Sequence, residues 1–303
     1  MPGLDNPEIY QSVLETLQTG VYLVDRSRHI RFWNAGAERI TGFIRQDVVG
    51  RFSREHLLAA TGRTKDVASD LADPINLVFR DGKTSITNAS ILHKDGYRVS
   101  VVLRTVPIRD SHGTVVGAAE SFDKNMSASD WTRRRAGLAD FGCLDEMTGV
   151  LSRKYIETQV RENLITFGEH KVPFGVLIVE VDGLQQFRAS RGPGVVPVIL
   201  RVVAQTVENS LRPTDLIGRW SEDRFLAVLI ECKESEVVKV GERVRKTVGK
   251  SEMEWWGDTF SVTCAFGGAG SRFGDSAEQL IERAEKSLHE SIVKGGNCVT
   301  TWT

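Results

Sequence analysis

The 303-residue sequence contains no apolar run that approaches the roughly 20 residues needed to cross a bilayer. Its longest candidates, residues 174–179 and 225–230, have the length of β-strands. The amino terminus, MPGLDNPEIY, has neither a basic flank nor an apolar core, so we expect no export signal. These absences argue against a membrane span and favour a cytoplasmic location.

Cysteine is scarce, and its positions follow no metal-binding pattern. The thiols are never as close in sequence as the ligands of a metal motif, which favours reduced side chains that are buried or inert. The four residues are Cys143, Cys232, Cys264 and Cys298.

The chain also lacks an excess of charge of either sign, because its formal net charge is -1. It therefore has no general attraction for nucleic acid or for an anionic membrane, and an anionic ligand must be bound by local groups. A content of 41% hydrophobic and 26% charged residues excludes a disordered or fibrous class. The length predicts about two globular domains.

Residues 7–124 follow an order of their own. A helical pattern is followed by two strands, a short helix that Asn34 caps, an irregular middle and three strand-like runs. The last three runs are separated by HKDG at 93–96 and DSHG at 110–113, which are typical hairpin turns. The expected elements are helices at 7–19 and 34–40, and strands at 20–25, 29–33, 84–92, 98–106 and 115–122.

This order resembles a PAS domain, as do the stretches GVYLVDRSRHIRFWNAGAERITGF and HKDGYRVSVVLRTVPIRDSHGTVVGAAESF. The resemblance implies an α+β unit at residues 1–124, in which helices cover a five-stranded antiparallel sheet with a small apolar pocket. Such a unit is a sensory or dimerising module. The residues do not identify the PAS ligand, and we expect the pocket to serve dimer contact or a metabolite.

Histidine raises the alternative of a haem site in this half. The candidates are isolated from one another, and a single histidine without a paired ligand is a weak signal. Two of them, His93 and His112, lie in predicted turns, so we expect both to be exposed to solvent. The other two candidates are His29 and His56.

A connecting segment at residues 125–142 is predicted to be helical, because its sparse apolar residues have helical spacing. It carries three consecutive arginines, at residues 133–135, which either bind a partner or lie on a solvated helix face; the second reading is favoured. If two chains pair through this segment, a change in the first domain would reach the second by reorienting helices.

Residues 143–303 carry two informative stretches. DEMTGVLSRKYIE stands at 145–157, and RPTDLIGRWSEDRF at 212–225 predicts a hairpin. Together they resemble the GGDEF domain of diguanylate cyclases, with SEDRF at the signature turn. The opening stretch matches the family at Asp145, Thr148, Gly149 and Arg153, whereas Ser152 replaces the usual asparagine. Strands that alternate with helices predict an α/β sheet, and the resemblance implies a GGDEF or nucleotidyl-cyclase-like fold. The expected strands are 174–181, 225–230 and 260–267, and the expected helices are 195–210 and 277–293.

The signature turn departs from the family in three of its residues. Ser221 and Glu222 replace two glycines that let the backbone approach a nucleotide, and Arg224 replaces an acid. Asp223 and Phe225 keep the family's residue types. If the protein is active, the resemblance makes Asp223 and Glu180 the catalytic carboxylates that hold Mg²⁺, although Glu180 is one methylene longer than the usual aspartate and fits magnesium's octahedron poorly.

The residues that would hold GTP are also altered. The positions that resemble the family's phosphate and guanine contacts carry Gln185, Arg188 and Pro197, and those of its phosphate-clamping cations carry Ile292 and Gly296. Lys294 or Arg224 is the nearest substitute for a lost phosphate cation. Each lost charge-assisted hydrogen bond costs about 1.5 to 3 kcal/mol, so we expect little or no cyclase activity.

Arg212 and Asp215 match the family's inhibitory RxxD motif, including its distance from the signature turn. The arginine fork suits a phosphate or a guanine Hoogsteen edge, and the carboxylate suits the N1 and N2 hydrogens of guanine. The motif therefore predicts cyclic di-GMP binding. The alternative is a solvated pair at a helix end.

Three functions are consistent with these residues. The first is a catalytically degenerate regulator or receptor that senses cyclic di-GMP under PAS control and acts on a downstream protein that the residues do not identify. The second is an active diguanylate cyclase that makes cyclic di-GMP from two GTP, with Mg²⁺ bound only when GTP is bound. The third is a dimerisation scaffold that uses no nucleotide. The resemblance also implies a homodimer.

Overall fold

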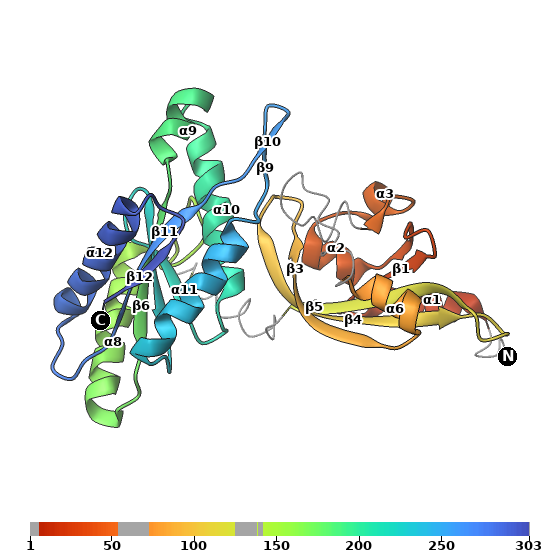
Figure 1. Cartoon of the computed structure of the whole chain (residues 1–303), viewed down its shortest axis with the longest axis horizontal. Coiled ribbons are helices and arrows are strands. Elements are labelled where there is room, and N and C mark those ends of the chain that lie inside the picture. Colours follow the sequence, from red (N-terminus) through yellow and green to blue (C-terminus); the bar gives the residue numbers. More distant parts are fainter. Residues whose placement is uncertain (1–5, 54–72, 125–137, 139–141, 303) are drawn as a thin grey trace. The chain divides into compact units, whose positions relative to one another are not determined.

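A computed structural model describes residues 6–53, 73–124, 138 and 142–302. The chain divides into two compact units: the first holds residues up to 126 apart from 96–98, and the second holds the remainder (Figure 1). Of the predicted connecting segment at 125–142, only Leu138 and Gly142 belong to the described residues. The arginines at 133–135 and His56 lie outside the described residues.

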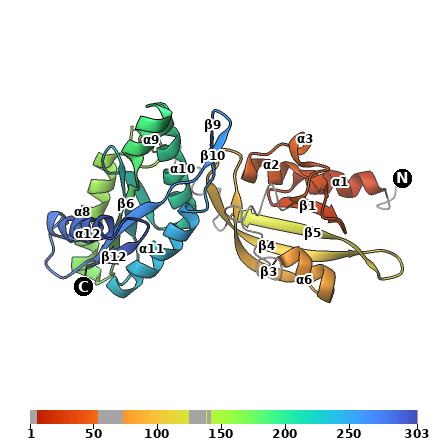
Figure 2. The ribbon, with the colours of Figure 1, turned by 45° about the horizontal axis from the view of Figure 1, so that its top comes forward.

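The first unit is built on a five-stranded sheet in the order β2-β1-β5-β4-β3 (Figure 2). The pairs β1–β2, β1–β5 and β4–β5 are antiparallel, as the sequence predicts. The strands are β1 (Gly20–Asp25), β2 (Ile30–Trp33), β3 (Ser85–Leu92), β4 (Arg98–Arg109) and β5 (Val115–Lys124). The helices are α1 (Pro7–Thr16), α2 (Ala35–Thr41), α3 (Arg45–Val48) and α6 (Pro74–Asp81).

Asn34 ties the start of α2 to the sheet. Its side chain is buried, and its Oδ1 accepts hydrogen bonds from the backbone N–H of Val21 and of Ala37, both at 2.8 Å. Its amide nitrogen donates to the carbonyl oxygens of Leu14 at 2.8 Å and Thr19 at 3.0 Å. One side chain thus caps the helix, as predicted, and also fixes the chain that leads into β1.

The prediction that His93 is exposed is wrong, because only 8% of this residue is accessible to solvent. The turn after β3 packs under Gly42, where an added Cβ would lie 2.6 Å from His93 Nε2. Burial lowers the pKa of His93 to about 4, so the imidazole is neutral near pH 7. His112 is exposed, as expected.

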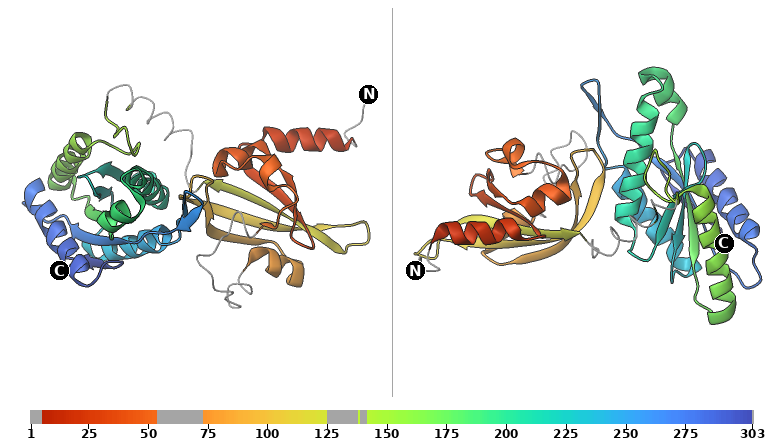
Figure 3. Two further views of the ribbon diagram at one scale, coloured as in Figure 1. Left: turned by 90° about the horizontal axis from the view of Figure 1, so that it is seen from above. Right: turned by 180° about the vertical axis from the view of Figure 1, so that it is seen from behind.

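The second unit is an α/β layered fold in which helices cover a central sheet (Figure 3). The sheet has five strands in the order β12-β11-β6-β8-β7. Only β11 and β12 run parallel among its paired strands. The strands are β6 (Gly175–Val181), β7 (Leu216–Arg219), β8 (Arg224–Leu229), β11 (Cys264–Gly270) and β12 (Val299–Thr301). The helices are α8 (Arg153–His170), α9 (Leu184–Arg191), α10 (Val195–Ser210), α11 (Glu234–Val248) and α12 (Ala277–Val293).

Two apolar cores cover the two faces of this sheet. Along β6, Leu177 and Val179 join the core that α10 and α11 complete, whereas Val176 and Ile178 join the core of α8 and α12. A strand buried on both faces reads as a continuous apolar run, which is why the sequence at 174–181 predicts it so clearly. The sheet therefore holds the strand ends that carry the candidate site residues in fixed register.

The predicted strand at 260–267 is misplaced, since β11 spans Cys264–Gly270. Phe260 instead ends a separate hairpin of β9 (Met253–Trp255) and β10 (Asp258–Phe260), whose turn has positive φ angles of 51° at Trp256 and 84° at Gly257. The ring of Phe260 lies 5.3 Å from that of Phe187 on α9, and the Arg191 guanidinium lies 4.6 Å from the Phe260 centroid. These contacts remove Phe260 from the main sheet.

We predict that Asn34→Ala destabilises the first unit by about 3 kcal/mol, because two backbone N–H groups and two carbonyl groups lose their buried partner. Urea unfolding of the full chain, combined with hydrogen exchange resolved to β1 and α2, measures the loss. Asn88→Ala on β3, an exposed position, is the control and should change stability by less than about 1 kcal/mol. Equal effects of the two variants would contradict this role.

Candidate functional site

The predicted metal corner lies where β6 ends and β8 begins. Glu180 and Arg224 are direct partners in the antiparallel register of these strands. Arg224 Nε donates to Glu180 Oε2 at 2.6 Å, and both side chains are partly buried. The cation that replaces the family's acid is therefore bonded to the first of the two carboxylates predicted to hold a metal.

The neighbouring aspartates also have partners. Asp182 Oδ2 accepts from Thr263 Oγ1 at 2.6 Å and from the Asn297 backbone N–H at 2.8 Å. Asp223 Oδ1 accepts from Ser221 Oγ at 3.0 Å. The structure thus brings Glu180, Asp182 and Asp223 to one end of two paired strands, with each carboxylate held by a group of the protein.

Magnesium fits these residues poorly. The ion needs near-ideal octahedral geometry from hard oxygen ligands. Here the Glu180 carboxylate already forms an ion pair with the permanently charged guanidinium of Arg224. Within residues 6–53, 73–124 and 142–302, no group of three or more histidine, cysteine, aspartate or glutamate side chains is placed to hold a metal ion.

The signature turn is held by a residue that the sequence analysis did not single out. Arg219, the last residue of β7, donates through Nε to the Ser221 carbonyl at 2.5 Å and through Nη2 to the Glu222 carbonyl. Its guanidinium lies 5.2 Å from the centroid of the Phe225 ring. The turn at 221–223 is thus fixed by the hairpin itself.

The stretch DEMTGVLSRKYIE joins α8 to this hairpin. Asp145 Oδ1 accepts from the backbone N–H of Thr148 at 2.9 Å and from its hydroxyl at 2.6 Å. Leu151 next donates to the Ile217 carbonyl at 3.1 Å and accepts from the Arg219 N–H at 2.7 Å. Arg153 stacks over Trp220, with 4.9 Å between the guanidinium and the ring centroid.

The predicted substrate positions offer little to a nucleotide. Gln185 and Arg188 are exposed on α9, and Pro197 lies in the first turn of α10. Lys294 Nζ lies 3.7 Å from Glu290 and donates to Thr300 at 3.3 Å. Gly296, with φ +77°, lies against Asp182, where an added Cβ would be 2.4 Å from Oδ1. A cation cannot stand at position 296 unless Asp182 moves.

Arg212 and Asp215 lie in the loop between α10 and β7. Asp215 is only 7% exposed, and its two oxygens accept from the backbone N–H groups of Arg212 at 2.9 Å and of Ile230 at 3.0 Å. Burial raises the pKa of Asp215 from its ordinary value. The alternative of a solvated pair therefore does not describe Asp215, which also closes the loop, whereas Arg212 is exposed.

A pocket of about 150 Å³ opens beside these two residues. Helix α11 supplies Lys239 and Arg243 to it, which lie one helical turn apart. Three cations face two acids there, which favours an anionic ligand. The lining residues are Arg212, Asp215, Leu229, Ile230, Cys232, Glu236, Lys239, Val240 and Arg243.

The pocket residues on α11 were not predicted from the sequence, because no helix was expected at residues 234–248. A signal was present: Glu236, Lys239 and Arg243 recur at helical spacing beside apolar valines. The helix is richer in charge and has fewer buried residues than α10 and α12, so its apolar content draws less attention although its apolar residues recur at helical spacing.

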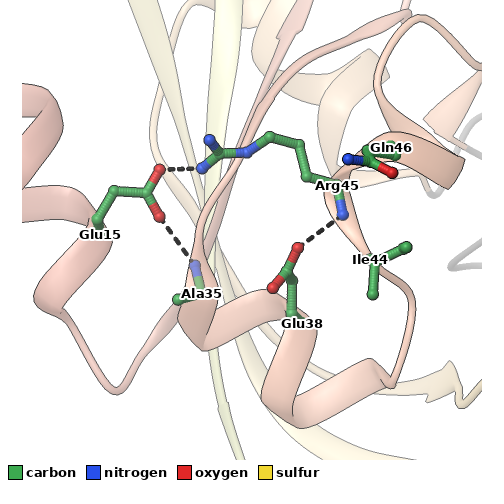
Figure 4. Close-up of a pocket in the computed structure, with 6 residues that line it drawn as sticks. All are labelled: Glu15, Ala35, Glu38, Ile44, Arg45 and Gln46. Carbon is green, nitrogen blue, oxygen red and sulfur yellow. Dashed lines mark hydrogen bonds and ion pairs between the residues drawn. The ribbon is translucent and has the colours of Figure 1, made fainter.

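A larger pocket, of about 360 Å³, lies in the first unit (Figure 4). Its charged groups face one another: Arg45 forms an ion pair with Glu15, and the Arg45 backbone N–H donates to Glu38 at 2.7 Å. Glu15 also accepts from the Ala35 N–H at 3.1 Å. This network attaches α1 to the starts of α2 and α3, which is a structural role.

We predict that Asp215→Asn lowers the free energy of unfolding of the second unit by about 1 to 3 kcal/mol, because an amide has one acceptor oxygen for two backbone donors. Chemical denaturation of the full chain measures this loss. Asp258→Asn, on the exposed β9–β10 hairpin, is the control and should be nearly neutral. An unchanged stability in Asp215→Asn would contradict the loop-closing role.

Comparison with solved structures shows the fold of the second unit. Diguanylate cyclase SiaD from Pseudomonas aeruginosa, solved with its activator SiaC, is 25% identical with a TM-score of 0.52, covering 57% of this chain and 67% of that one. The GGDEF domain of DgcB from Caulobacter crescentus, solved with c-di-GMP, is 20% identical with a TM-score of 0.51, covering 53% of this chain and 93% of that one.

Curated relatives match the same half. Diguanylate cyclase A from Treponema denticola is 29% identical over 167 residues, which are 54% of this chain and 45% of the relative. Diguanylate cyclase DosC from Escherichia coli strain K12 is 28% identical over 160 residues, which are 52% of this chain and 35% of the relative. The chain thus spans less than half the length of these relatives.

No helix in the described part of the chain is both long and apolar enough to cross a bilayer.

Residues 8–119 match the family model of the PAS fold. Residues 143–298 match the model described as diguanylate cyclase, GGDEF domain. The match covers just over half of the 303 residues, so the chain belongs to the GGDEF family of diguanylate cyclase domains, with a PAS domain before it.

Proposed function

We propose that this chain is a regulatory member of the GGDEF family, which binds cyclic di-GMP beside Arg212 and does not condense GTP. One contrast carries the proposal. Three cationic side chains line the pocket beside Arg212, whereas at the metal corner the Glu180 carboxylate forms an ion pair with Arg224. Positive charge that can bind the phosphates of a nucleotide is therefore present in the pocket, and the negative charge that would bind a metal ion is already compensated at the corner.

The chemistry of the pocket supports this ligand. Cyclic di-GMP offers two phosphates and two guanines, and an arginine fork can bind either a phosphate or a guanine Hoogsteen edge. The exposed guanidinium of Arg212 is available for such a contact at the rim, while Lys239 and Arg243 add positive charge from α11. Binding of c-di-GMP by the similar DgcB domain supports the same ligand class here.

Asp215 can still serve the ligand although its carboxylate closes the loop. Each carboxylate oxygen has two lone-pair sites, and each accepts one backbone N–H here. One site on each oxygen is left for the N1 and N2 hydrogens of guanine. The same backbone bonds hold the carboxylate in place before a ligand arrives, which lowers the entropic cost of binding.

The loss of catalysis is supported by several changes that act together. Arg224 neutralises Glu180, Asp182 binds Thr263 and Asn297, and a cationic side chain at position 296 would require Asp182 to move. To activate a hydroxyl group at this corner, the protein would have to break the Arg224–Glu180 bond and keep a guanidinium beside the metal. Both steps oppose metal binding electrostatically.

An active cyclase is the second candidate. It is favoured by the names of the curated relatives, which are diguanylate cyclases, and by the carboxylates that still gather at the ends of β6 and β8. In that case Glu180 and Asp223 would hold Mg²⁺ with bound GTP. A scaffold that uses no nucleotide is the third candidate.

The remaining parts of the proposal concern control. We propose that the PAS domain regulates the second unit within a homodimer, and that the output is a contact with a downstream protein. GTP can bind weakly without turnover in this scheme. The protein then acts in the cytoplasm as a receptor in cyclic di-GMP signalling.

We predict that the full chain binds cyclic di-GMP and that Arg212→Ala weakens the affinity at least about 10-fold, since a charge-assisted contact contributes about 1.5 to 3 kcal/mol. Isothermal titration calorimetry with cyclic di-GMP and, separately, with GTP measures both affinities. Arg161→Ala is the matched control, because this arginine makes exposed ion pairs on α8.

Equal affinities of the Arg212→Ala variant and the parent chain would remove the assignment of this pocket. If the parent chain binds neither nucleotide, the result favours the third candidate, a scaffold that uses no nucleotide. The arginine is substituted rather than Asp215 because a change at Asp215 also destabilises the loop.

We predict no cyclic dinucleotide product when the purified chain is incubated with GTP and Mg²⁺, because the carboxylate of Glu180 is held by Arg224. Chromatography of the reaction mixture, with an active GGDEF cyclase as the positive control, measures the product. Robust turnover that Asp223→Asn abolishes would overturn the proposal in favour of the active cyclase.

A further inference from the structure

Three side chains form a hydrogen-bonded row across the central strands of the PAS sheet. Glu120 on β5 is the cross-strand partner of Tyr22 on β1 and of Thr105 on β4. Each of the three is at most 1% exposed. Thr105 Oγ1 donates to Glu120 Oε1 at 2.5 Å, and the Tyr22 hydroxyl donates to Oε2. A carboxyl group is thus enclosed in the core between two neutral hydroxyl donors.

Other charges near Glu120 come from the elements packed against the row. Asp73, the N-cap of α6, and Arg28, in the turn between β1 and β2, act on it electrostatically in opposite directions. They form a buried ion pair with each other, so the cation is already compensated by a nearer acid. The aromatic rings of Trp33 and Phe122 pack against Tyr22 and complete an apolar surrounding.

We infer that Glu120 is a proton-responsive residue of the PAS domain, and that its gain or loss of a proton reorders the row of Tyr22, Glu120 and Thr105 in the neutral pH range. The ionised carboxylate can only accept, and both hydroxyls lie within hydrogen-bond distance of it. The protonated acid has one donor of its own, so one neighbouring hydroxyl must turn and become the acceptor. Two arrangements of the same core therefore exist, and the proton selects between them.

The electrostatics support this inference. Burial is the largest influence, and it raises the pKa of Glu120 from 4.5 to about 7, although the hydrogen bonds from Thr105 and Tyr22 act in the opposite direction. Asp73 adds to the rise, and Arg28 reduces it. A carboxyl group thus titrates where histidine ordinarily does. His93, by contrast, stays neutral through this range because burial lowers its pKa to about 4.

The sign of the linkage to stability follows from the raised pKa. The folded PAS domain holds the Glu120 proton more tightly than the unfolded chain, so the stability that this group contributes is fully present below pH 4.5 and is lost as pH rises through about 7. From that difference, the unfolding equilibrium of this domain rises by a factor of about 300 across the window on account of Glu120. Glu120, at the centre of the row, lies on β5, which is the last strand before the segment that leads to the GGDEF domain. The change in its protonation therefore occurs on the element from which a signal would leave.

Infrared difference spectroscopy of the full chain between pH 5 and 9 tests the inference, because the carbonyl band of a buried protonated carboxyl group is distinct from that of a carboxylate. We expect a band that titrates with a midpoint near pH 7 in the parent chain and is absent from Glu120→Gln. The exposed Glu8→Gln on α1 is the control and should keep the band. A midpoint below pH 5, or an unchanged band in Glu120→Gln, would overturn the inference.

A second variant keeps the test decisive if Glu120→Gln does not fold. Thr105→Val removes one donor to the ionised form and should move the midpoint to higher pH, whereas a merely structural carboxyl group would leave it in place. Hydrogen exchange of β4 and β5, corrected for intrinsic rates, should change between pH 6 and 8 in the parent chain but not in Glu120→Gln. None of these readouts uses a nucleotide, so they stand or fall separately from the proposed cyclic di-GMP site.

Discussion

The antiparallel pairing of β6 with β8 is the constraint on which the candidate site of the GGDEF domain depends. Its register runs without a shift from Gly175 opposite Leu229 to Glu180 opposite Arg224. At one end it brings the guanidinium to the carboxylate of the metal corner. At the other end β8 leads into Ile230, whose N–H binds Asp215. The two ends of the same strand pair thus determine what each candidate site can do.

The two sites therefore differ in a way that composition cannot reveal. A net charge of -1 would suggest no preference for anions, yet cations from the α10–β7 loop and from α11 gather in one pocket. At the metal corner the carboxylates of Glu180, Asp182 and Asp223 are present, but each already accepts a hydrogen bond from another side chain, and Glu180 also forms an ion pair. Function here follows from which charges already have partners rather than from which residue types are present.

Much of the fold could be predicted from the sequence because its signals are local. Helix α12 begins at the predicted residue, where Ser276 and Gln279 cap each other, and α10 carries a broad apolar face. Predictions failed where distant contacts decide. His93 is buried because another turn, at Gly42, approaches it, and Phe260 leaves the main sheet because Phe187 and Arg191 hold it. The ion pair of Arg224 with Glu180 required the strand register, which no motif contains.

The crowding at Gly296 constrains which residues can stand at two positions. Any side chain there would collide with Asp182, whose Oδ2 accepts hydrogen bonds from the Thr263 hydroxyl and from the Asn297 backbone N–H. A mutation that placed a cation at this position would first displace Asp182 and so loosen the packing between the end of β6 and the loop before β12. Residues 182 and 296 are therefore coupled, and a longer side chain at one of them needs an adjustment at the other.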